Sequence, residues 1–166
     1  MSVGKFTQKE MGGNLSWDYV KKIKDRWGGP VILKGIMHAD DARKAVDLGF
    51  EAIVVSNHGA RQFDGVKPSI EVLPAIVDAV GGKTAIMLDS GVRTGLDVIR
   101  AIALGADFVL LGRAFMYGLG ALGNYGGDHN IEILMAEMKN NMAQLGLESL
   151  QEIKELGDEM RKNGNL

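Results

Sequence analysis

A histidine and an arginine lie three residues apart in the segment SNHGARQFDG, residues 56–65. The His58 imidazole can accept a proton near neutral pH, and the Arg61 guanidinium can bind a carboxylate through two parallel hydrogen bonds. The pair therefore predicts a site for an anionic substrate that must lose a proton. The alternatives are a structural histidine and a surface ion pair between Arg61 and Asp64. We rank them lower, because the polar or flexible residues 56–59 would pack poorly at the end of an apolar strand.

Two glycine-containing turns also carry arginines. The first is the segment DSGVRTG, residues 89–95, and the second begins at Gly112-Arg113. Backbone N–H groups at a glycine turn or a helix N-terminus bind phosphate, and Arg93 and Arg113 would add positive charge. These turns predict a phosphate site, with plain glycine turns and surface arginines as the alternative.

Lys34 interrupts an apolar run between Leu33 and Gly35. An ammonium group inside a protein is costly unless it meets an anion or an electron-rich partner. The alternative is a side chain that extends from the end of the strand into solvent. This residue alone leaves both interpretations open.

Four short apolar runs, at 31–33, 52–55, 85–88 and 108–111, predict the strands that position these groups. Each run is apolar on successive residues, which is typical of parallel strands covered on both faces. The candidate groups follow the ends of these runs, where barrel enzymes carry their active sites. An open flavodoxin-like sheet also binds ligands at that edge, so we favour the barrel without excluding the open sheet.

Helical periodicity surrounds the strands in segments 17–27, 40–49, 69–82, 94–105 and 131–145. Ser69 and Thr94 are expected as N-caps, and Asp97 would complete a capping box with Thr94. The alternation of strands and helices predicts an α/β fold, namely the (β/α)4 half of a TIM barrel with parallel strands and flanking helices.

Composition restricts the class of protein. The 166 residues are 46% hydrophobic and 24% charged, as expected for one globular domain, and the net charge of -2 argues against a nucleic-acid partner. The chain has no cysteine, and His38 and His129 are expected in cap and surface positions, so we expect no metal site. No segment reaches the length of a membrane span. We expect cytoplasmic residence and leave peripheral attachment to the inner face of the membrane open.

Taken together, the motifs ILKG (32–35), SNHGARQFDG (56–65), DSGVR (89–93) and LGR (111–113) resemble the C-terminal half of the FMN-dependent L-2-hydroxy acid dehydrogenase and oxidase family. The quinone-linked L-lactate dehydrogenases are the most similar branch. The resemblance covers residues 15–153, so we expect 1–14 to be an N-terminal extension and 154–166 a polar C-terminal tail. It implies FMN as the cofactor and a small 2-hydroxy acid, such as L-lactate, as the substrate.

The resemblance also implies roles for individual residues. His58 would be the catalytic base, and Arg61 would hold the substrate carboxylate. Whether the base takes the proton of the α-carbon or of the hydroxyl group stays open. The implied FMN contacts are Lys34, Ser56, Asp89, Gly91, Arg93, Gly112 and Arg113. Lys34 would lie beside the flavin ring, where its charge stabilises the reduced form.

Full-length members of this family have four more strands, which supply a substrate-binding tyrosine and the aspartate that orients the base. Tyr117 and Tyr125 do not correspond to that tyrosine. We therefore expect the chain to act when a copy of itself or an N-terminal half-barrel completes it, since a half-barrel exposes strand edges and apolar surface. One alternative is a non-catalytic module that binds FMN or phosphate. Another is a phosphate-binding barrel like those of inosine-monophosphate dehydrogenase relatives, which Lys34, His58 and Arg61 disfavour.

Overall fold

A computed structural model describes residues 4–6 and 15–164, and the chain forms two compact units, Met1–Val31 and Ile32–Leu166. In the first unit, helix α2 (Trp17–Trp27) begins where the Ser16 hydroxyl accepts a hydrogen bond from the Tyr19 backbone N–H. It ends at Gly28, which has a left-handed φ of 66°. The predicted helix 17–27 is confirmed. The predicted extension at 1–14 lies largely outside the described residues.

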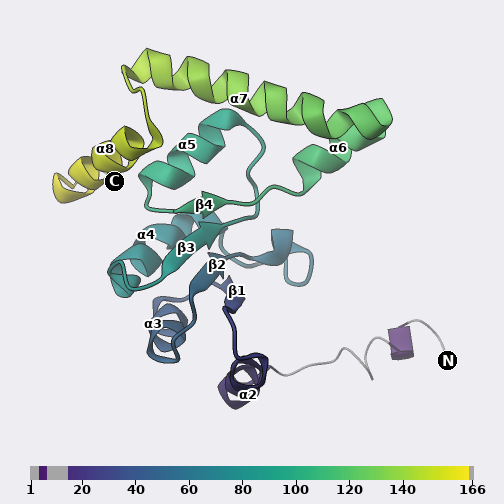
Figure 1. Ribbon diagram of the computed structural model, residues 1–166, viewed down its shortest axis with the longest axis vertical. Helices are drawn as coiled ribbons and strands as arrows, with labels where there is room; N and C mark the ends of the chain where they lie inside the picture. The colour runs from purple at the N-terminus through teal and green to yellow at the C-terminus, as the bar shows by residue number, and fades with distance from the viewer. Residues whose placement is uncertain (1–3, 7–14, 165–166) are drawn as a thin grey trace. The chain divides into compact units, whose positions relative to one another are not determined.

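The second unit is built on four parallel strands, β1 (Ile32–Ile36), β2 (Ala52–Val55), β3 (Ala85–Leu88) and β4 (Phe108–Val109). They lie in the order β1-β2-β3-β4, as Figure 1 shows. A flavodoxin-like sheet places its first strand between the second and third, whereas a barrel keeps neighbours in chain order. The sheet therefore has the order of a barrel segment.

Two strands differ from their predicted bounds. Lys34 lies within β1, not beyond its end, and its register partner is Val54 on β2. A bulge then follows at Gly35, whose φ of 98° suits a residue without a Cβ atom. β4 ends at Val109, two residues before the end of its apolar run.

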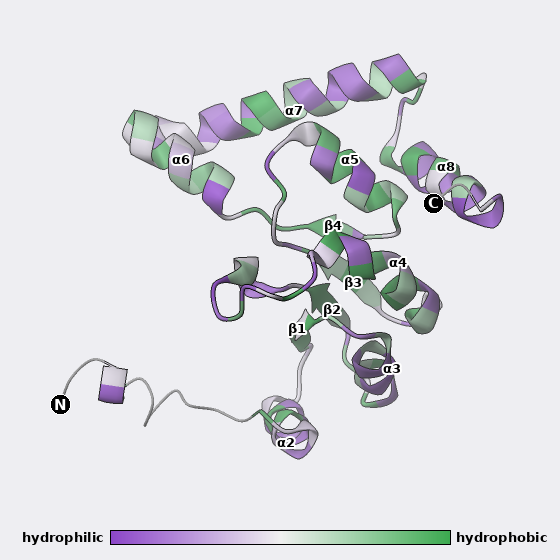
Figure 2. Cartoon of the chain, turned by 180° about the vertical axis from the view of Figure 1, so that it is seen from behind, coloured by the Kyte–Doolittle hydropathy of each residue, from purple (hydrophilic) through white to green (hydrophobic). Residues whose placement is uncertain are grey.

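Three helices, α3 (Ala39–Asp47), α4 (Ser69–Val80) and α5 (Gly95–Ala103), cover one face of the sheet. The strands are largely hydrophobic in Figure 2. Their side chains on this face, including Ile53 and Leu88, are buried, as are Leu73 and Ile76 of α4. Burial of these side chains is the main stabilising contribution in this unit.

The predicted caps have different outcomes. Thr94 and Asp97 form the predicted capping box at the start of α5, and His38 caps α3. The prediction for Ser69 is wrong, because Pro68 is the N-cap of α4. The Ser69 hydroxyl instead donates to the backbone oxygens of Asp89, at 2.5 Å, and Ser90, at 3.1 Å. Its contacts are with the loop after β3.

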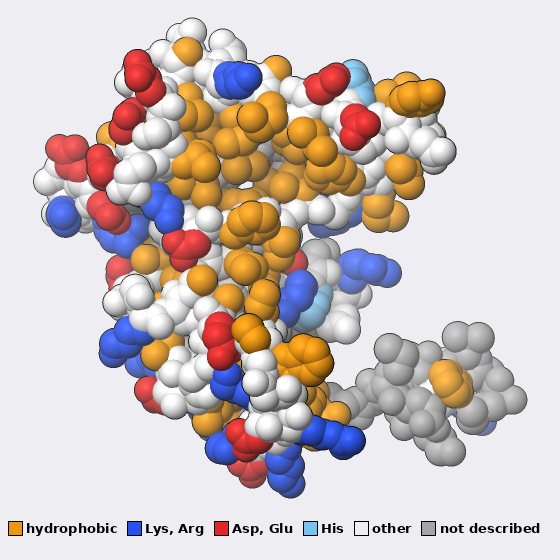
Figure 3. Space-filling model, viewed as in Figure 1, with side chains coloured by type: hydrophobic (Ala, Val, Ile, Leu, Met, Phe, Trp, Pro, Cys, Tyr) orange, Lys and Arg blue, Asp and Glu red, His pale blue; other side chains and the backbone are white. Residues whose placement is uncertain are grey.

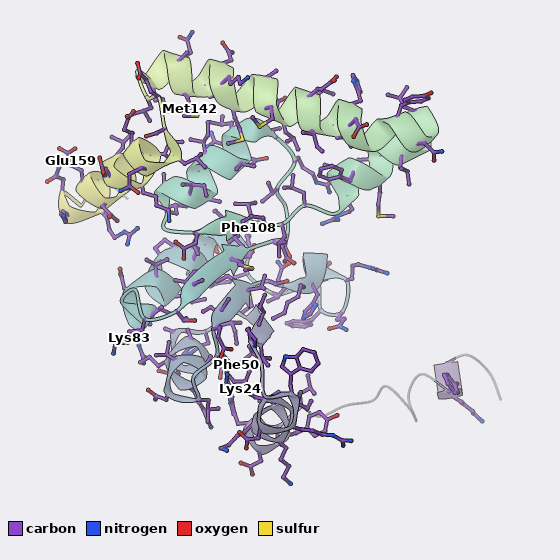
Figure 4. All side chains as sticks on the ribbon, in the orientation of Figure 1. Lys24, Phe50, Lys83, Phe108, Met142 and Glu159 are labelled. Atoms are coloured by element: carbon purple, nitrogen blue, oxygen red, sulfur yellow. The ribbon has the colours of Figure 1, made fainter. Side chains whose placement is uncertain are left out.

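Three further α-helices follow β4 in the described chain: α6 (Arg113–Leu122), α7 (Gly126–Leu145) and α8 (Leu150–Lys162), with a short 3-10 helix (Gly123–Tyr125) between the first two. The sequence did not predict α6, and α7 begins five residues before its predicted start. Ile99, Ile102 and Ile153 form a core cluster between α5 and α8, to which Met142 of α7 adds (Figure 4). Helix α8 runs through the expected boundary between residues 153 and 154. No helix in the described ranges is long and apolar enough to cross a membrane.

The opposite face of the sheet is less covered. Lys34, Val54, Met87 and Phe108 form one row across all four strands. Phe108 is 57% exposed, and Ile32 on the same face is 51% exposed. In the view of Figure 3, hydrophobic side chains gather over the strands and over the region between them and α7. On the sheet face that carries Lys34, the exposed apolar side chains lie on the edge strands β1 and β4, whereas Val54 of β2 is only 2% exposed.

Candidate active site at the carboxyl ends of the strands

A cavity of about 770 Å³ opens at the carboxyl ends of the strands. The loops after β2, β3 and β4 supply most of its lining, and Lys34 reaches it from β1. Predicted site residues that line it are Lys34, His58, Arg61, Asp89, Gly91, Arg93, Gly112 and Arg113. Ser56, the remaining one, is 1% exposed and lies beneath the surface of the cavity.

The loop that carries His58 has a rare backbone conformation. His58, Gly59 and Ala60 all have left-handed φ values, of 55°, 69° and 57°. Such a run is strained for residues other than glycine and persists only when surrounding contacts fix it. The Asn57 side chain supplies two contacts, because its Oδ1 accepts hydrogen bonds from the backbone N–H groups of Gly59, at 2.9 Å, and Ala60, at 3.2 Å.

The His58 imidazole lies against the bulge in β1. A Cβ atom placed on Gly35 would be 3.0 Å from His58 Nε2, so the ring occupies space that only a glycine leaves open. No hydrogen bond or ion pair to the imidazole is present in the described part of the chain. The carboxylate that orients the base in the similar family is thus not supplied by these residues.

Lys34 and Asp89 form an ion pair at the base of the cavity, with 3.1 Å between Nζ and Oδ2. Lys34 Nζ also donates to Ser56 Oγ at 2.9 Å. Burial alone would raise the pKa of Asp89. Hydrogen bonds from Ser56, Ser90 and Lys34, together with the Lys34 charge, outweigh burial and lower that pKa below its usual value. Asp89 is therefore a carboxylate, able to accept hydrogen bonds from ligand hydroxyl groups.

The arginines lie around the turn that begins α6. Gly112 is the N-cap of this helix and provides no side-chain cap, so the N–H groups of the first turn remain available to a ligand. A Cβ atom added to Gly59 would lie 3.2 Å from Arg113 Nη2, so that guanidinium lies close to the His58 loop. Arg93 lies over the Tyr117 ring, 5.4 Å from its centroid.

Arg61 is exposed and does not form an ion pair with Asp64, and within the described residues its guanidinium has no partner. The positive groups at the cavity outnumber the single carboxylate of Asp89. The site therefore suits a ligand with more than one negative group.

The sequence did not identify several supporting residues. Asn57 fixes the turn after His58, Gly35 makes room for its ring, and Ser69 and Ser90 hold the loop after β3. A polar residue directly before a histidine was a usable signal for Asn57. The bridges made by the two serines join loops that are far apart in the sequence, and no local pattern signals them.

The chain is similar to proteins of known sequence and structure. A family model described as FMN-dependent dehydrogenase matches residues 1–157. The L-lactate dehydrogenase of Pseudomonas aeruginosa (strain LESB58) is 53% identical over 140 residues, which are 84% of this chain and 37% of that protein. The L-lactate dehydrogenase of Pseudomonas putida (strain GB-1) is 52% identical over the same shares.

Solved structures show the same likeness. Mandelate oxidase with (S)-2-phenylpropionate is 44% identical, with a TM-score of 0.80 over 84% of this chain and 42% of that chain. A mandelate oxidase variant with a monooxide FMN adduct has the same TM-score and identity, over 84% of this chain and 45% of that chain. The chain spans less than half the length of these relatives, and the predicted partial TIM barrel is confirmed.

Proposed function

The chain belongs to the FMN-dependent dehydrogenase family, and we propose that it supplies the catalytic half of a barrel that oxidises L-lactate, or a similar small L-2-hydroxy acid, with FMN. One observation carries the proposal. A base, an unpaired guanidinium and an arginine-flanked helix N-terminus line the same cavity. These are the groups needed to deprotonate a carboxylate substrate next to a phosphate-bearing cofactor.

The residues present fit the phosphate end of FMN. The uncapped first turn of α6 offers backbone N–H groups, and Arg93 and Arg113 add charge. Cβ atoms added to Gly91 or Gly112 would meet nothing within 4 Å, so the backbone there is open to close approach. The cavity volume is also within the usual range for ligand sites.

The other end of the cavity fits the remaining groups of the cofactor. Ionised Asp89 would accept hydrogen bonds from the ribityl hydroxyl groups, and Lys34 would place its charge beside the flavin ring. Ser56 would act from below through its hydrogen bond with Lys34. When bound, FMN would accept the electron pair that leaves the substrate.

Arg61 and His58 would act on the substrate. Oxidation of a 2-hydroxy acid to a 2-oxo acid breaks one C–H bond and one O–H bond, and it releases two electrons and two protons. His58 would accept one of these protons, as the exposed imidazole is free to do. Arg61 would bind the carboxylate and so fix the position of the α-carbon.

The open face of the sheet supports completion by a second half-barrel. Apolar side chains such as Ile32 and Phe108 are exposed there, and β1 and β4 are the two edge strands. Parallel strands with uncovered faces and free edges are unusual in stable proteins. We propose that residues 15–153 form this half-barrel and that four further strands, from an N-terminal half or a copy of the chain, complete it.

The place of the protein in the cell is part of the same proposal. We propose cytoplasmic residence, with peripheral attachment to the inner face of the membrane as the variant to be distinguished. Cell fractionation followed by a high-salt wash separates the two, because salt releases electrostatically attached proteins.

A second candidate is a non-catalytic module that binds FMN or phosphate. It is favoured by the lack of a carboxylate next to the His58 imidazole in the described residues. Both candidates require the phosphate site, so FMN binding tests what they share. Only turnover separates them.

Titration of FMN with the chain, followed by flavin fluorescence, is the first experiment. Arg113→Gln should weaken binding by about ten-fold or more, because it removes a charge-assisted contact to phosphate. Arg43→Gln is the matched control, since Arg43 pairs with Asp40 on α3 and lies outside the cavity lining. Equal affinity for FMN in the Arg113 variant and the control would contradict the assigned phosphate site.

A further inference from the structure

Ser90 joins the loop after β3 to the loop that carries His58, and we infer that it is a positioning residue for the His58 base. The role of His58 as a base rests on the proposed function. The contacts of Ser90 are hydrogen bonds within the chain and do not depend on that function.

The Ser90 hydroxyl is used as both donor and acceptor. It donates to Asp89 Oδ1 at 2.7 Å, and its oxygen accepts a hydrogen bond from the Gly59 backbone N–H at 3.1 Å. The same N–H also donates to Asn57 Oδ1, at 2.9 Å, so the two acceptors share it. Gly59 directly follows His58 in the left-handed run. One hydroxyl group therefore links the ionised carboxylate to the backbone that holds the base.

A second serine makes the matching contact from the other side. The His58 backbone N–H donates to Ser56 Oγ at 3.2 Å, and Lys34 Nζ donates to the same oxygen at 2.9 Å. Because Lys34 also pairs with Asp89, the contacts form a closed ring. The backbone N–H groups of His58 and Gly59 thus each donate to a serine oxygen. Each of these serines also contacts the ion pair between Lys34 and Asp89.

This arrangement accounts for the unusual backbone of the loop. Left-handed φ values at His58 and Ala60 require contacts from outside the turn to persist. Asn57 supplies contacts from within the same loop, whereas Ser90 supplies one from a different strand end. Ser90 therefore fixes where the base loop lies relative to β3, and with it the distance between His58 and Asp89.

The backbone of Ser90 is itself strained. Its φ of 75° favours glycine, so a serine at this position is unfavourable for the conformation of its own turn. Its hydroxyl group makes the contacts that a glycine could not. If this position served only to form the turn, glycine would be the favourable residue.

The two roles can be separated with Ser90→Ala and Ser90→Gly. Both variants lose the hydroxyl group, but only the glycine variant relieves the backbone strain. We expect Ser90→Gly to melt at a higher temperature than Ser90→Ala. Ser149→Ala is the matched control, because Ser149 caps α8 through a 3.2 Å hydrogen bond from the Glu152 N–H, outside the cavity lining.

Two measurements on the full 166-residue chain test the positioning role: hydrogen exchange of the Gly59 amide and the NMR chemical shifts of the His58 ring. Both Ser90 variants should speed Gly59 exchange by about three-fold, because the hydrogen bond to Asn57 remains, and should move the His58 ring signals, whereas Ser149→Ala should change neither. Gly59 exchange and His58 ring signals identical to those of the unsubstituted chain would overturn the inference. Neither measurement uses FMN or lactate. The results of both would therefore stand even if the proposed function were wrong.

Discussion

The Lys34 ammonium lies 3.1 Å from the Asp89 carboxylate, although one residue is on β1 and the other follows β3. Ser56, at the end of the intervening β2, accepts a hydrogen bond from Lys34 between them. With Ser56, the pair links β1 to the residues that directly follow β2 and β3, and it fixes the only carboxylate among the described cavity-lining residues. Loss of either charge would therefore change the net charge of the cavity lining.

Lys34→Met should raise the pKa of Asp89, because it removes both a hydrogen bond and a positive charge that lower that pKa. Carboxyl NMR titration measures the change directly. The matched control is Lys83→Met, on the turn after α4 (Figure 4), and it should leave the Asp89 titration unchanged. An unaltered Asp89 titration in the Lys34 variant would show that the ion pair does not control this carboxylate.

Asp97→Asn tests the capping box of α5. Burial would raise the pKa of Asp97, but hydrogen bonds from the Arg93 and Thr94 N–H groups and the Thr94 side chain outweigh it and lower that pKa below 3.8. Since the folded pKa is lowered, the stabilisation is complete above the unfolded pKa and is lost as pH falls through the folded value. At neutral pH the variant should lose about 1 kcal/mol of unfolding free energy.

Urea unfolding at neutral pH and at about pH 3 or below checks this dependence. The difference in unfolding free energy between the variant and the unsubstituted chain should be smaller at the acidic pH than at neutral pH. Asp64→Asn, at an exposed position in the loop that carries His58, is the control. A difference that stayed constant with pH would mean that the charge of Asp97 does not contribute.

The sequence predicted the parts of this structure that depend on local signals. Apolar runs located all four strands, and the spacing of Thr94 and Asp97 located the start of α5. Helix α6 escaped prediction because its segment RAFMYGLGAL has two glycines, no acidic first turn and no capping side chain. Its role in the site comes from where it begins, which sequence periodicity does not report.

The sequence predicted the residues that line the candidate site but not the contacts that support them. Residue chemistry and family resemblance selected the groups that line the cavity, because a base, arginines and glycine turns have recognisable types and spacing. The supporting contacts were not predictable. Ser90 and Gly59 are 31 residues apart in the sequence. Ser69 precedes an apolar helical pattern, as an N-cap does, but its hydroxyl donates to the backbone of the turn after β3.

Gly35→Ala should displace the His58 imidazole. The added Cβ atom would lie 3.0 Å from His58 Nε2, at a φ of 98° that is unfavourable for alanine. We expect a lower melting temperature and altered NMR signals from the His58 ring. Gly120→Ala is the control, because its Cβ would meet nothing within 4 Å inside α6, and it should raise stability by about 0.5–1 kcal/mol. Unchanged His58 signals in the Gly35 variant would contradict the assigned contact.

Gly157→Ala should loosen α8 from α5. An added Cβ atom would overlap the Ala103 backbone oxygen, so the two helices must separate and expose Ile153. We expect a loss of about 1–3 kcal/mol in unfolding free energy, measured by urea unfolding. Gly127→Ala on α7, where a Cβ would meet nothing within 4 Å, is the comparison variant. Equal stability of the two variants would argue against close packing of α8 on α5.

We propose that His58 and Arg61 serve a flavin-dependent oxidation of a 2-hydroxy acid. The most direct test of this claim is the flavin absorbance of the FMN-loaded protein, combined with an N-terminal half-barrel, after anaerobic addition of L-lactate. We predict that the absorbance bleaches and that His58→Gln, with FMN still bound, prevents bleaching. FMN-loaded, completed protein whose absorbance does not change with L-lactate would contradict the claim and favour the non-catalytic module.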